Sequence, residues 1–314
     1  MYNFVYCFDK NYLKQAFVSL GSILQNVNEP IVVHLISNIA KENLIIPDKI
    51  LNHRFLKKVE SYKISMPQLN IYNLKNVHVT EATFYRLFIE NYLKSVDEYF
   101  IYLDCDIICL KDPIQSITAV IAEMKNQKKS VAFNTEILKS DDDWYFHNLN
   151  LSGDKYFNAG VMIFNVDTWN NSLILNKSLK LISILKEKAK FWDQDILNVI
   201  FDGEFYELPN QLNSRVRDDE VENVVFHHFS GKYKPWTIHG FNQKYSKEFH
   251  DVYKYFYNQS YLIEVNNISN AFNQYLFNIK SSKKKYFTKD LKLNLYFLKA
   301  ILKKTIKKLV FKNE

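Results

Sequence analysis

Residues 3–37, NFVYCFDKNYLKQAFVSLGSILQNVNEPIVVHLIS, combine the two residue patterns that decide the fold. The first segment, 3–8, is a short run rich in aromatic residues, and the last, 31–37, is a continuous apolar run typical of a buried parallel strand. Between them, residues 12–24 carry leucine and phenylalanine at helical spacing. A strand, a helix and a second strand in this order predict a β-α-β unit with a parallel sheet.

Two further segments extend this pattern along the chain. Residues 82–93 have the composition of a helix, and residues 99–103, YFIYL, form the next buried apolar run. We therefore expect an α/β domain over residues 1–240, in which helices flank a mixed, mostly parallel sheet. A helical extension over residues 241–280 and a basic tail over residues 281–314 complete the expected organisation.

The composition fits a folded protein of the cytoplasm. With 47% hydrophobic residues and only six glycines and six prolines in 314 residues, the chain supports a large core without long disordered linkers. No apolar run reaches the roughly 18 residues needed to cross a bilayer, and the first residues lack the basic region of a secretion signal. The three cysteines, Cys7, Cys105 and Cys109, form no CxxC pair, which argues against disulfides and zinc.

The net charge of +7 is concentrated at the carboxyl end of the chain. Residues 280–314 hold twelve lysines against two acidic residues, so the tail carries +10 and the remaining chain carries −3. A nucleic-acid-binding function loses its main support, because the body of the protein is nearly neutral.

The tail has the pattern of an amphipathic helix. Between residues 291 and 309, leucine and isoleucine recur at helical spacing while lysines fall on the opposite side. This pattern predicts a segment that lies in an anionic lipid interface, so we expect a cytoplasmic protein attached peripherally to the inner face of the cytoplasmic membrane. The alternative is a helix that packs on the body with its lysines in solvent.

Polar residues follow three of the apolar runs. They are Asp9–Asn11, Asp104–Asp106 and His227–His228, the last set after the run 224–226. Ligands of parallel α/β sheets bind beyond the carboxyl ends of the strands. We therefore expect these residues to converge on one edge of the sheet.

The segment YLDCDIICLKDP, residues 102–113, contains the clearest chemical signal. Asp104 and Asp106 stand at i and i+2, so on extended backbone their carboxylates project from the same face. Such a pair grips a hard divalent cation that also bridges a diphosphate. A pair of solvated or capping aspartates is the alternative, but both residues end a buried run, where unpaired charges are costly.

A second cluster lies in HHFSGKYKPW, residues 227–236. The imidazole of His228 would complete an oxygen-rich site that suits Mn²⁺ better than Mg²⁺. Gly231 would let the backbone approach a phosphate, and Lys234 would add positive charge. A lone histidine after a strand is more often structural, and the spacing to Gly231 and Lys234 favours the metal-site interpretation.

Six sequence blocks in this order resemble glycosyltransferase family 8, which includes bacterial lipooligosaccharide galactosyltransferases and, more distantly, glycogenin. The blocks are FDKNY (8–12), FYRL (84–87), YLDCD (102–106), YFNAGVMIFN (156–165), DQDILN (193–198) and HxxGxxKPW (228–236). Together they span residues 1–240, and an ordered set is far more specific than any single motif.

The resemblance implies a GT-A fold, a UDP-hexose donor, Mn²⁺ and retention of the anomeric configuration. It implies Asp104, Asp106 and His228 as metal ligands, Asp9, Asn11 and Tyr12 around uridine and ribose, and Gly231 and Lys234 at the diphosphate, with Cys105 also among the donor-binding residues. Arg86, Asn158, Asp193 and Gln194 would face the donor sugar, and His78 would lie in the acceptor cleft.

Retention requires either a protein nucleophile or attack by the acceptor on the face that the leaving group departs from. Gln194 stands where a nucleophile is expected, but an amide oxygen is a weak one. We therefore favour same-face attack, with Gln194 stabilising an oxocarbenium-like centre. Asp193 is the alternative covalent residue, or else a helix N-cap. The acidic residue that the family places near the sugar is open among Asn134, Thr135 and Glu136.

The sequence thus predicts a retaining hexosyltransferase that moves galactose or glucose from a UDP-sugar to a glycan or glycolipid, in lipopolysaccharide or other surface polysaccharide synthesis. Residues 139–154 are a candidate acceptor-covering loop. A protein acceptor, as in glycogenin, and a catalytically inactive membrane-associated adaptor are alternatives. A nucleotidyltransferase is a further alternative, but the glycine-rich loop of that class is missing, because residues 2–24 contain only Gly21.

Overall fold

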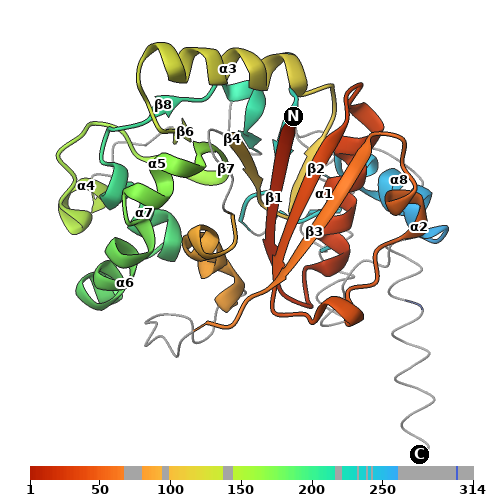
Figure 1. Ribbon diagram of the computed structural model, residues 1–314, viewed down its shortest axis with the longest axis horizontal. Coiled ribbons are helices and arrows are strands. Elements are labelled where there is room, and N and C mark those ends of the chain that lie inside the picture. Colours follow the sequence, from red (N-terminus) through yellow and green to blue (C-terminus); the bar gives the residue numbers. More distant parts are fainter. Residues whose placement is uncertain are drawn as a thin grey trace, which may run out of the picture.

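A mixed sheet covered by helices on both faces forms the centre of the protein (Figure 1). This computed structural model describes residues 1–66, 80–93, 99–136, 144–215, 221–231, 233–237, 240–241, 243–260 and 302.

The main sheet has seven strands in the order β3-β2-β1-β4-β7-β6-β8. Their bounds are β1 Tyr2–Phe8, β2 Ile31–Ser37, β3 Leu56–Lys63, β4 Tyr99–Leu103, β6 Val131–Thr135, β7 Phe157–Asn165 and β8 Tyr206–Glu207. Strand β7 runs antiparallel to its neighbours β4 and β6, and the other pairs of adjacent strands are parallel. The prediction of a mixed, mostly parallel sheet is confirmed.

The β-α-β unit predicted from residues 3–37 is present. Helix α1, Leu13–Asn26, connects β1 to β2, and the two strands pair in parallel along their whole lengths. The predicted helix over residues 82–93 is a 3₁₀ helix, η2, at Glu81–Asn91. Its first turn is capped by Thr80, whose side chain accepts a hydrogen bond from the Ala82 N–H.

The pairing of β6 with β7 contains an irregularity that matters for the site. Phe133 faces Met162, but the next residue, Asn134, faces Asn158. The residues of β7 between these partners, Ala159 to Val161, are skipped by β6, as in a β-bulge. The backbone N–H groups of Ala159 and Gly160 are therefore free of the β6 ladder.

A second, three-stranded sheet has the order β5-β10-β9. Its strands are β5 Ile107–Cys109, β9 Ser214–Arg215 and β10 Phe226–His228. We expected the strand to end at residue 226, before the two histidines. It continues to His228 because β10 pairs antiparallel with β5, and this register sets His228 opposite Ile107, next to Asp106.

The two faces of the main sheet pack against different helices. Phe4, Tyr6 and Phe8 of β1 point to one face, and Val5 and Cys7 point to the other, as strand geometry requires. The hydrophobic cluster on the first face also includes residues of α1, α3 and α8, and the cluster on the second face includes residues of η2, α5, α6 and α7. The remaining bounds are η1 Lys41–Asn43, α2 Asp48–Leu51, α3 Ile114–Asn126, α4 Trp144–Leu149, α5 Val166–Asn171, α6 Ile174–Leu185, η4 Lys186–Lys188, α7 Trp192–Phe201, η5 Asn210–Leu212 and α8 Ser246–Tyr257.

Helix α8 lies in the predicted extension and packs directly on α1. A Cβ added at Gly21 of α1 would lie 2.5 Å from the Phe256 ring, so this glycine permits the close approach. His78, residues 139–143 of the candidate loop and the tail 281–314, except Leu302, lie outside the described residues. The described helices include none that is both long and apolar enough to span a bilayer.

Candidate active site

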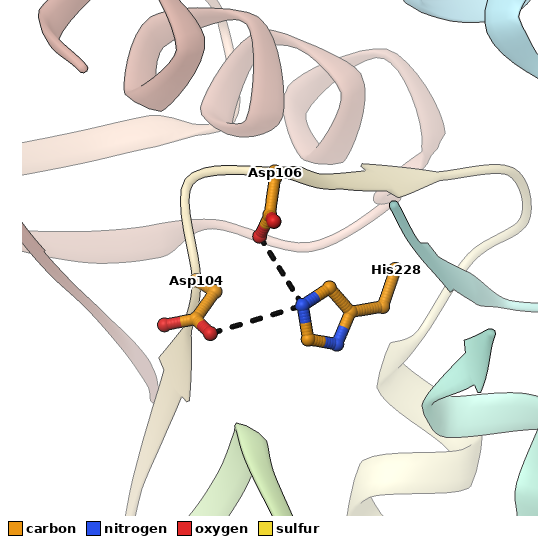
Figure 2. A group of neighbouring side chains, drawn as sticks. All are labelled: Asp104, Asp106 and His228. Atoms are coloured by element: carbon orange, nitrogen blue, oxygen red, sulfur yellow. Dashed lines mark ion pairs between the residues drawn. The ribbon is translucent and has the colours of Figure 1, made fainter. Parts of the chain in front are cut away.

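Asp104, Asp106 and His228 converge at one edge of the sheet (Figure 2). Asp104 follows β4, Asp106 precedes β5, and His228 ends β10. The His228 Nε2 lies 3.8 Å from Asp104 Oδ2 and 3.3 Å from Asp106 Oδ1. One ligand atom from each residue lies within 4.8 Å of the other two. Two carboxylate oxygens and one imidazole nitrogen at this spacing fit a divalent cation.

Two cationic side chains flank the carboxylates. Arg86 Nη2 lies 2.7 Å from Asp104 Oδ1, and Lys234 Nζ forms an ion pair with Asp106. Burial raises the pKa of Asp106, but Lys234 and His228 outweigh this effect and hold it well below its usual range. Asp106 is therefore ionised at neutral pH, as a metal ligand must be. We call these five side chains, Asp104, Asp106, His228, Arg86 and Lys234, the charged cluster.

Arg86 also joins the cluster to helix α7. Its Nε lies 2.7 Å from Asp193 Oδ2, and its Nη1 donates a 2.6 Å hydrogen bond to the Ala159 carbonyl. Burial raises the pKa of Asp193 to about 7, while Arg86 opposes this shift. The N-cap alternative for Asp193 is wrong, because Phe191 is the N-cap of α7 and the Asp193 carboxylate turns inward to Arg86. Asp195 instead accepts hydrogen bonds from the backbone N–H groups of Lys190 and Phe191, which directly precede that helix.

Gln194 is held by hydrogen bonds at both ends of its amide. Its Oε1 accepts from the Ala159 N–H at 3.2 Å and from Asn158 Nδ2 at 3.1 Å. Its Nε2 donates to the Tyr156 hydroxyl at 3.0 Å, and that hydroxyl donates to Asp195. The amide oxygen is thus engaged with two donors from strand β7.

Asn158 connects Gln194 to the metal side of the site. Its Oδ1 accepts from Asn213 Nδ2 at 2.9 Å, and Asn213 Oδ1 lies 3.1 Å from His228 Nδ1. Gly160 lies against the same imidazole, because a Cβ built there would be 2.2 Å from His228 Cε1. We call Asn213, Asn158 and Gln194 the amide chain.

Residues 3–240 match the family model described as "Glycosyl transferase family 8". The chain belongs to this family. A lipopolysaccharide 1,2-glucosyltransferase of Escherichia coli is 28% identical over 262 residues, which cover 75% of this chain and 73% of that protein. A lipopolysaccharide 1,3-galactosyltransferase of Salmonella typhimurium is 27% identical over 266 residues, which cover 76% and 74% of the two chains.

The fold of this family 8 glycosyltransferase also has solved counterparts. The crystal structure of the galactosyltransferase LgtC, in complex with donor and acceptor sugar analogs, superimposes with a TM-score of 0.67 at 19% identity. The match covers 81% of this chain and 96% of LgtC. The GT-A fold expected from the sequence blocks is confirmed.

In this protein, the residues predicted to surround the nucleotide lie in the turn between β1 and α1. Asp9 Oδ1 accepts hydrogen bonds from the Asn11 N–H at 2.8 Å and the Tyr12 N–H at 3.3 Å, so the carboxylate shapes this turn. The Tyr12 ring packs edge-on against Trp236, with 5.9 Å between centroids. This contact brings the first and last sequence blocks together.

The structure also places two further residues that were predicted to bind the donor, Gly231 and Cys105. Gly231, in the turn after β10, has a φ of +67°, a conformation that favours glycine. The Cys105 side chain points into the core, where its thiol donates to the Cys7 carbonyl at 3.6 Å and burial raises its pKa. The Cys105 side chain is therefore part of the hydrophobic core.

Among the three residues that the sequence left open, Asn134, Thr135 and Glu136, the carboxylate of Glu136 contacts the amide chain. Its Oε1 accepts from Asn158 Nδ2 at 3.2 Å, whereas Asn134 donates to the Leu208 carbonyl and Asn210. The Glu136 carboxylate is also 2.8 Å from Arg215 Nη1, and both side chains are at least four-fifths buried. Sequence reasoning missed Arg215 and Asn213, because they lie in or beside the two-residue strand β9, which has no detectable pattern.

Proposed function

We propose that this glycosyltransferase transfers galactose or glucose from a UDP-sugar to a glycan or glycolipid acceptor, with Mn²⁺ as cofactor, Mg²⁺ as the alternative ion, and retention of anomeric configuration. The observation that carries the proposal is the convergence of Asp104, Asp106 and His228 at the carboxyl edge of a GT-A sheet. Family 8 membership supplies the reaction class.

The charged cluster suits the departure of a nucleoside diphosphate. When bound, a divalent cation would supply positive charge to the leaving diphosphate. Lys234 lies beside Asp106 and contributes a second positive charge from the protein. With the leaving group stabilised in this way, the reaction needs no general acid to protonate it.

The hydrogen bonds around Gln194 and Asp193 support same-face attack by the acceptor. Both donors on Gln194 Oε1 withdraw electron density from an oxygen that is already a weak nucleophile. The Asp193 carboxylate is 4% exposed and paired with Arg86, so it is not presented as a free nucleophile. The role that we expected for the Gln194 oxygen, stabilising an oxocarbenium-like centre, is weakened by the same hydrogen bonds.

The acceptor class rests on the relatives. Two of them are described as lipopolysaccharide glucosyl- and galactosyltransferases, which supports a lipopolysaccharide or a related surface glycan as the acceptor. Attachment of residues 281–314 to the inner face of the cytoplasmic membrane stays a prediction from the lysine pattern. Sedimentation with anionic liposomes, comparing the full chain with a chain ending at residue 280, tests it, and equal sedimentation would contradict it.

The proposed function is tested by UDP release from a panel of UDP-sugars, with Mn²⁺ or with EDTA. We expect slow hydrolysis of UDP-glucose or UDP-galactose without an acceptor, dependent on the metal and faster when lipopolysaccharide core is added. Intact mass after the reaction distinguishes a self-glucosylating protein, which would gain hexose units. The absence of release from every sugar nucleotide, with and without acceptor, would favour the inactive adaptor.

A further inference from the structure

Two backbone N–H groups determine which atom donates and which atom accepts in each hydrogen bond of the amide chain. A backbone N–H can only donate, so each side-chain atom that meets one must be an acceptor. The Gly160 N–H lies 3.0 Å from Asn158 Oδ1, and the Ala159 N–H lies 3.2 Å from Gln194 Oε1. Both N–H groups belong to the segment Ala159 to Val161, which the bulge in β7 leaves out of the β6 ladder.

Starting from the Gly160 N–H, the donors and acceptors can be assigned step by step as far as His228. Because Asn158 Oδ1 is an acceptor, the Asn213 atom 2.9 Å away must be its amino nitrogen. The Asn213 oxygen then faces His228 Nδ1 at 3.1 Å, so this nitrogen must carry the proton. The other ring nitrogen, Nε2, is the one that faces Asp104 and Asp106 and can present a lone pair to a metal.

Starting from the Ala159 N–H, a second assignment through Gln194 gives the same orientation of the Asn158 amide. Gln194 Oε1 is an acceptor, so the Asn158 atom 3.1 Å away must be an amino nitrogen. The same Asn158 nitrogen donates to Glu136 at 3.2 Å, which uses its second hydrogen. Asn158 therefore has one orientation that satisfies all its neighbours, with its oxygen toward Asn213 and its nitrogen toward Gln194.

We propose that Asn213 is a positioning residue of the metal site, which fixes His228 in the Nδ1–H tautomer and ties it to Asn158 on the donor-sugar side. The side chain is fully buried and makes these two contacts with opposite hydrogen-bonding roles. Its effect on metal binding rests on the proposed function, whereas its effect on the tautomer does not. A metal-bound histidine depends on such a partner at its second nitrogen, and loss of the partner costs about 10–100-fold in metal affinity.

The tautomer is measured directly on the wild-type protein without metal. A long-range ¹H–¹⁵N spectrum, recorded at a pH at which its own titration shows the His228 ring to be neutral, distinguishes a protonated Nδ1 from a protonated Nε2, and His228→Gln identifies the signals by their loss. We expect His228 as the Nδ1–H form. An Nε2–H form would overturn the proposal, whatever the metal-binding results.

Two substitutions of Asn213 separate its two contacts. Asn213→Asp keeps an acceptor for the His228 Nδ1–H but sets an oxygen against Asn158 Oδ1, and Asn213→Leu removes both contacts. We expect Asn213→Leu to weaken Mn²⁺ binding by about 10–100-fold, and Asn213→Asp to bind within about threefold of wild type but to lose transfer activity. Mn²⁺ alone, followed by electron paramagnetic resonance, is the probe.

Asn3→Leu is the matched control. Asn3 is also a buried asparagine that contacts a histidine, with its Oδ1 3.3 Å from His34 Nε2, but it lies in β1 away from the cluster. The Asn3→Leu substitution should leave Mn²⁺ affinity unchanged. Wild-type affinity in Asn213→Leu would overturn the proposal. If wild type itself bound no Mn²⁺, the proposed function and the metal half of this inference would both fail, and the spectrum would decide the tautomer half.

Discussion

The charged cluster and the amide chain lie side by side and hold their polar groups in different ways. In the charged cluster, ion pairs compensate each carboxylate, and Asp104 stays 24% exposed. In the amide chain, neutral groups are joined by hydrogen bonds of fixed direction, and Asn213 is fully buried. Charge supplies the attraction for a metal and a diphosphate, whereas the amides supply orientation. Substitutions in the two regions should therefore fail in different ways.

The largest effect is expected for Asp106→Asn in the charged cluster. The change removes a proposed metal ligand and leaves Lys234 without its partner, so UDP release should fall by about 1000-fold. The matched control is Asp112→Asn in the same segment, because Asp112 accepts a hydrogen bond from the Ile114 N–H at the start of α3, which asparagine can also do. Activity of Asp106→Asn near that of the control would contradict the role of the cluster.

Arg86→Lys should have the next largest effect. A lysine cannot meet Asp104, Asp193 and the Ala159 carbonyl at once, as the planar guanidinium does. We expect about a 100-fold loss of activity and about 1–3 kcal/mol of stability, measured by urea unfolding. Arg54→Lys, at an exposed position, is the control and should change neither quantity. A stable, active Arg86→Lys protein would show that charge alone suffices there.

Gln194→Ala tests the amide chain by itself. The substitution removes the acceptor for the Ala159 N–H and the Asn158 amide, so we expect turnover to fall about 10–100-fold through lost orientation. Mn²⁺ affinity should stay at the wild-type level, because the charged cluster is intact. A large loss of metal affinity would mean that the two regions are not separable. Intact mass during turnover should show no glycosyl adduct in wild type, and an adduct would contradict same-face attack.

The difference between the two regions also explains what the sequence revealed. Asp9 and Asp104 directly follow apolar runs, and Asp106 lies two residues beyond Asp104, so both the sheet and the carboxylates at its edge could be predicted from local sequence. Asn213 and Arg215 depend on partners 55 and 81 residues away in the chain, and nothing near them has a period. Asp193 was open to a helix-cap interpretation because its partner, Arg86, comes from another element. The bulge in β7 is likewise set by pairing between distant strands.

The smallest effect on activity is expected at His227, the neighbour of His228 in β10. Burial lowers the pKa of His227 to about 3 and that of His250 to about 4, so both are neutral in the folded protein. In the unfolded chain both histidines bind protons with a pKa near 6.5, whereas in the folded protein they stay neutral. The free energy of unfolding is therefore highest above about pH 6.5 and falls as the pH drops toward 4.

In the His227→Phe variant, the free energy of unfolding should therefore decrease less as the pH falls. Unfolding in urea at pH 7.5 and pH 5 measures the change, and the free energy of unfolding should fall less between these values in the variant than in wild type. UDP release at neutral pH should be unaffected, because the ring packs against Phe229 and Tyr245 rather than the cluster. An unchanged pH dependence would contradict burial of a neutral His227.

Titration of UDP into the protein by calorimetry, with Mn²⁺ or with EDTA, tests most directly whether the charged cluster joins a metal to the nucleotide. Wild type should bind UDP at least about tenfold more tightly with Mn²⁺ than with EDTA, and Asp106→Asn should lose that difference. Equal binding of UDP in both conditions, or a metal effect that survives in Asp106→Asn, would contradict the account.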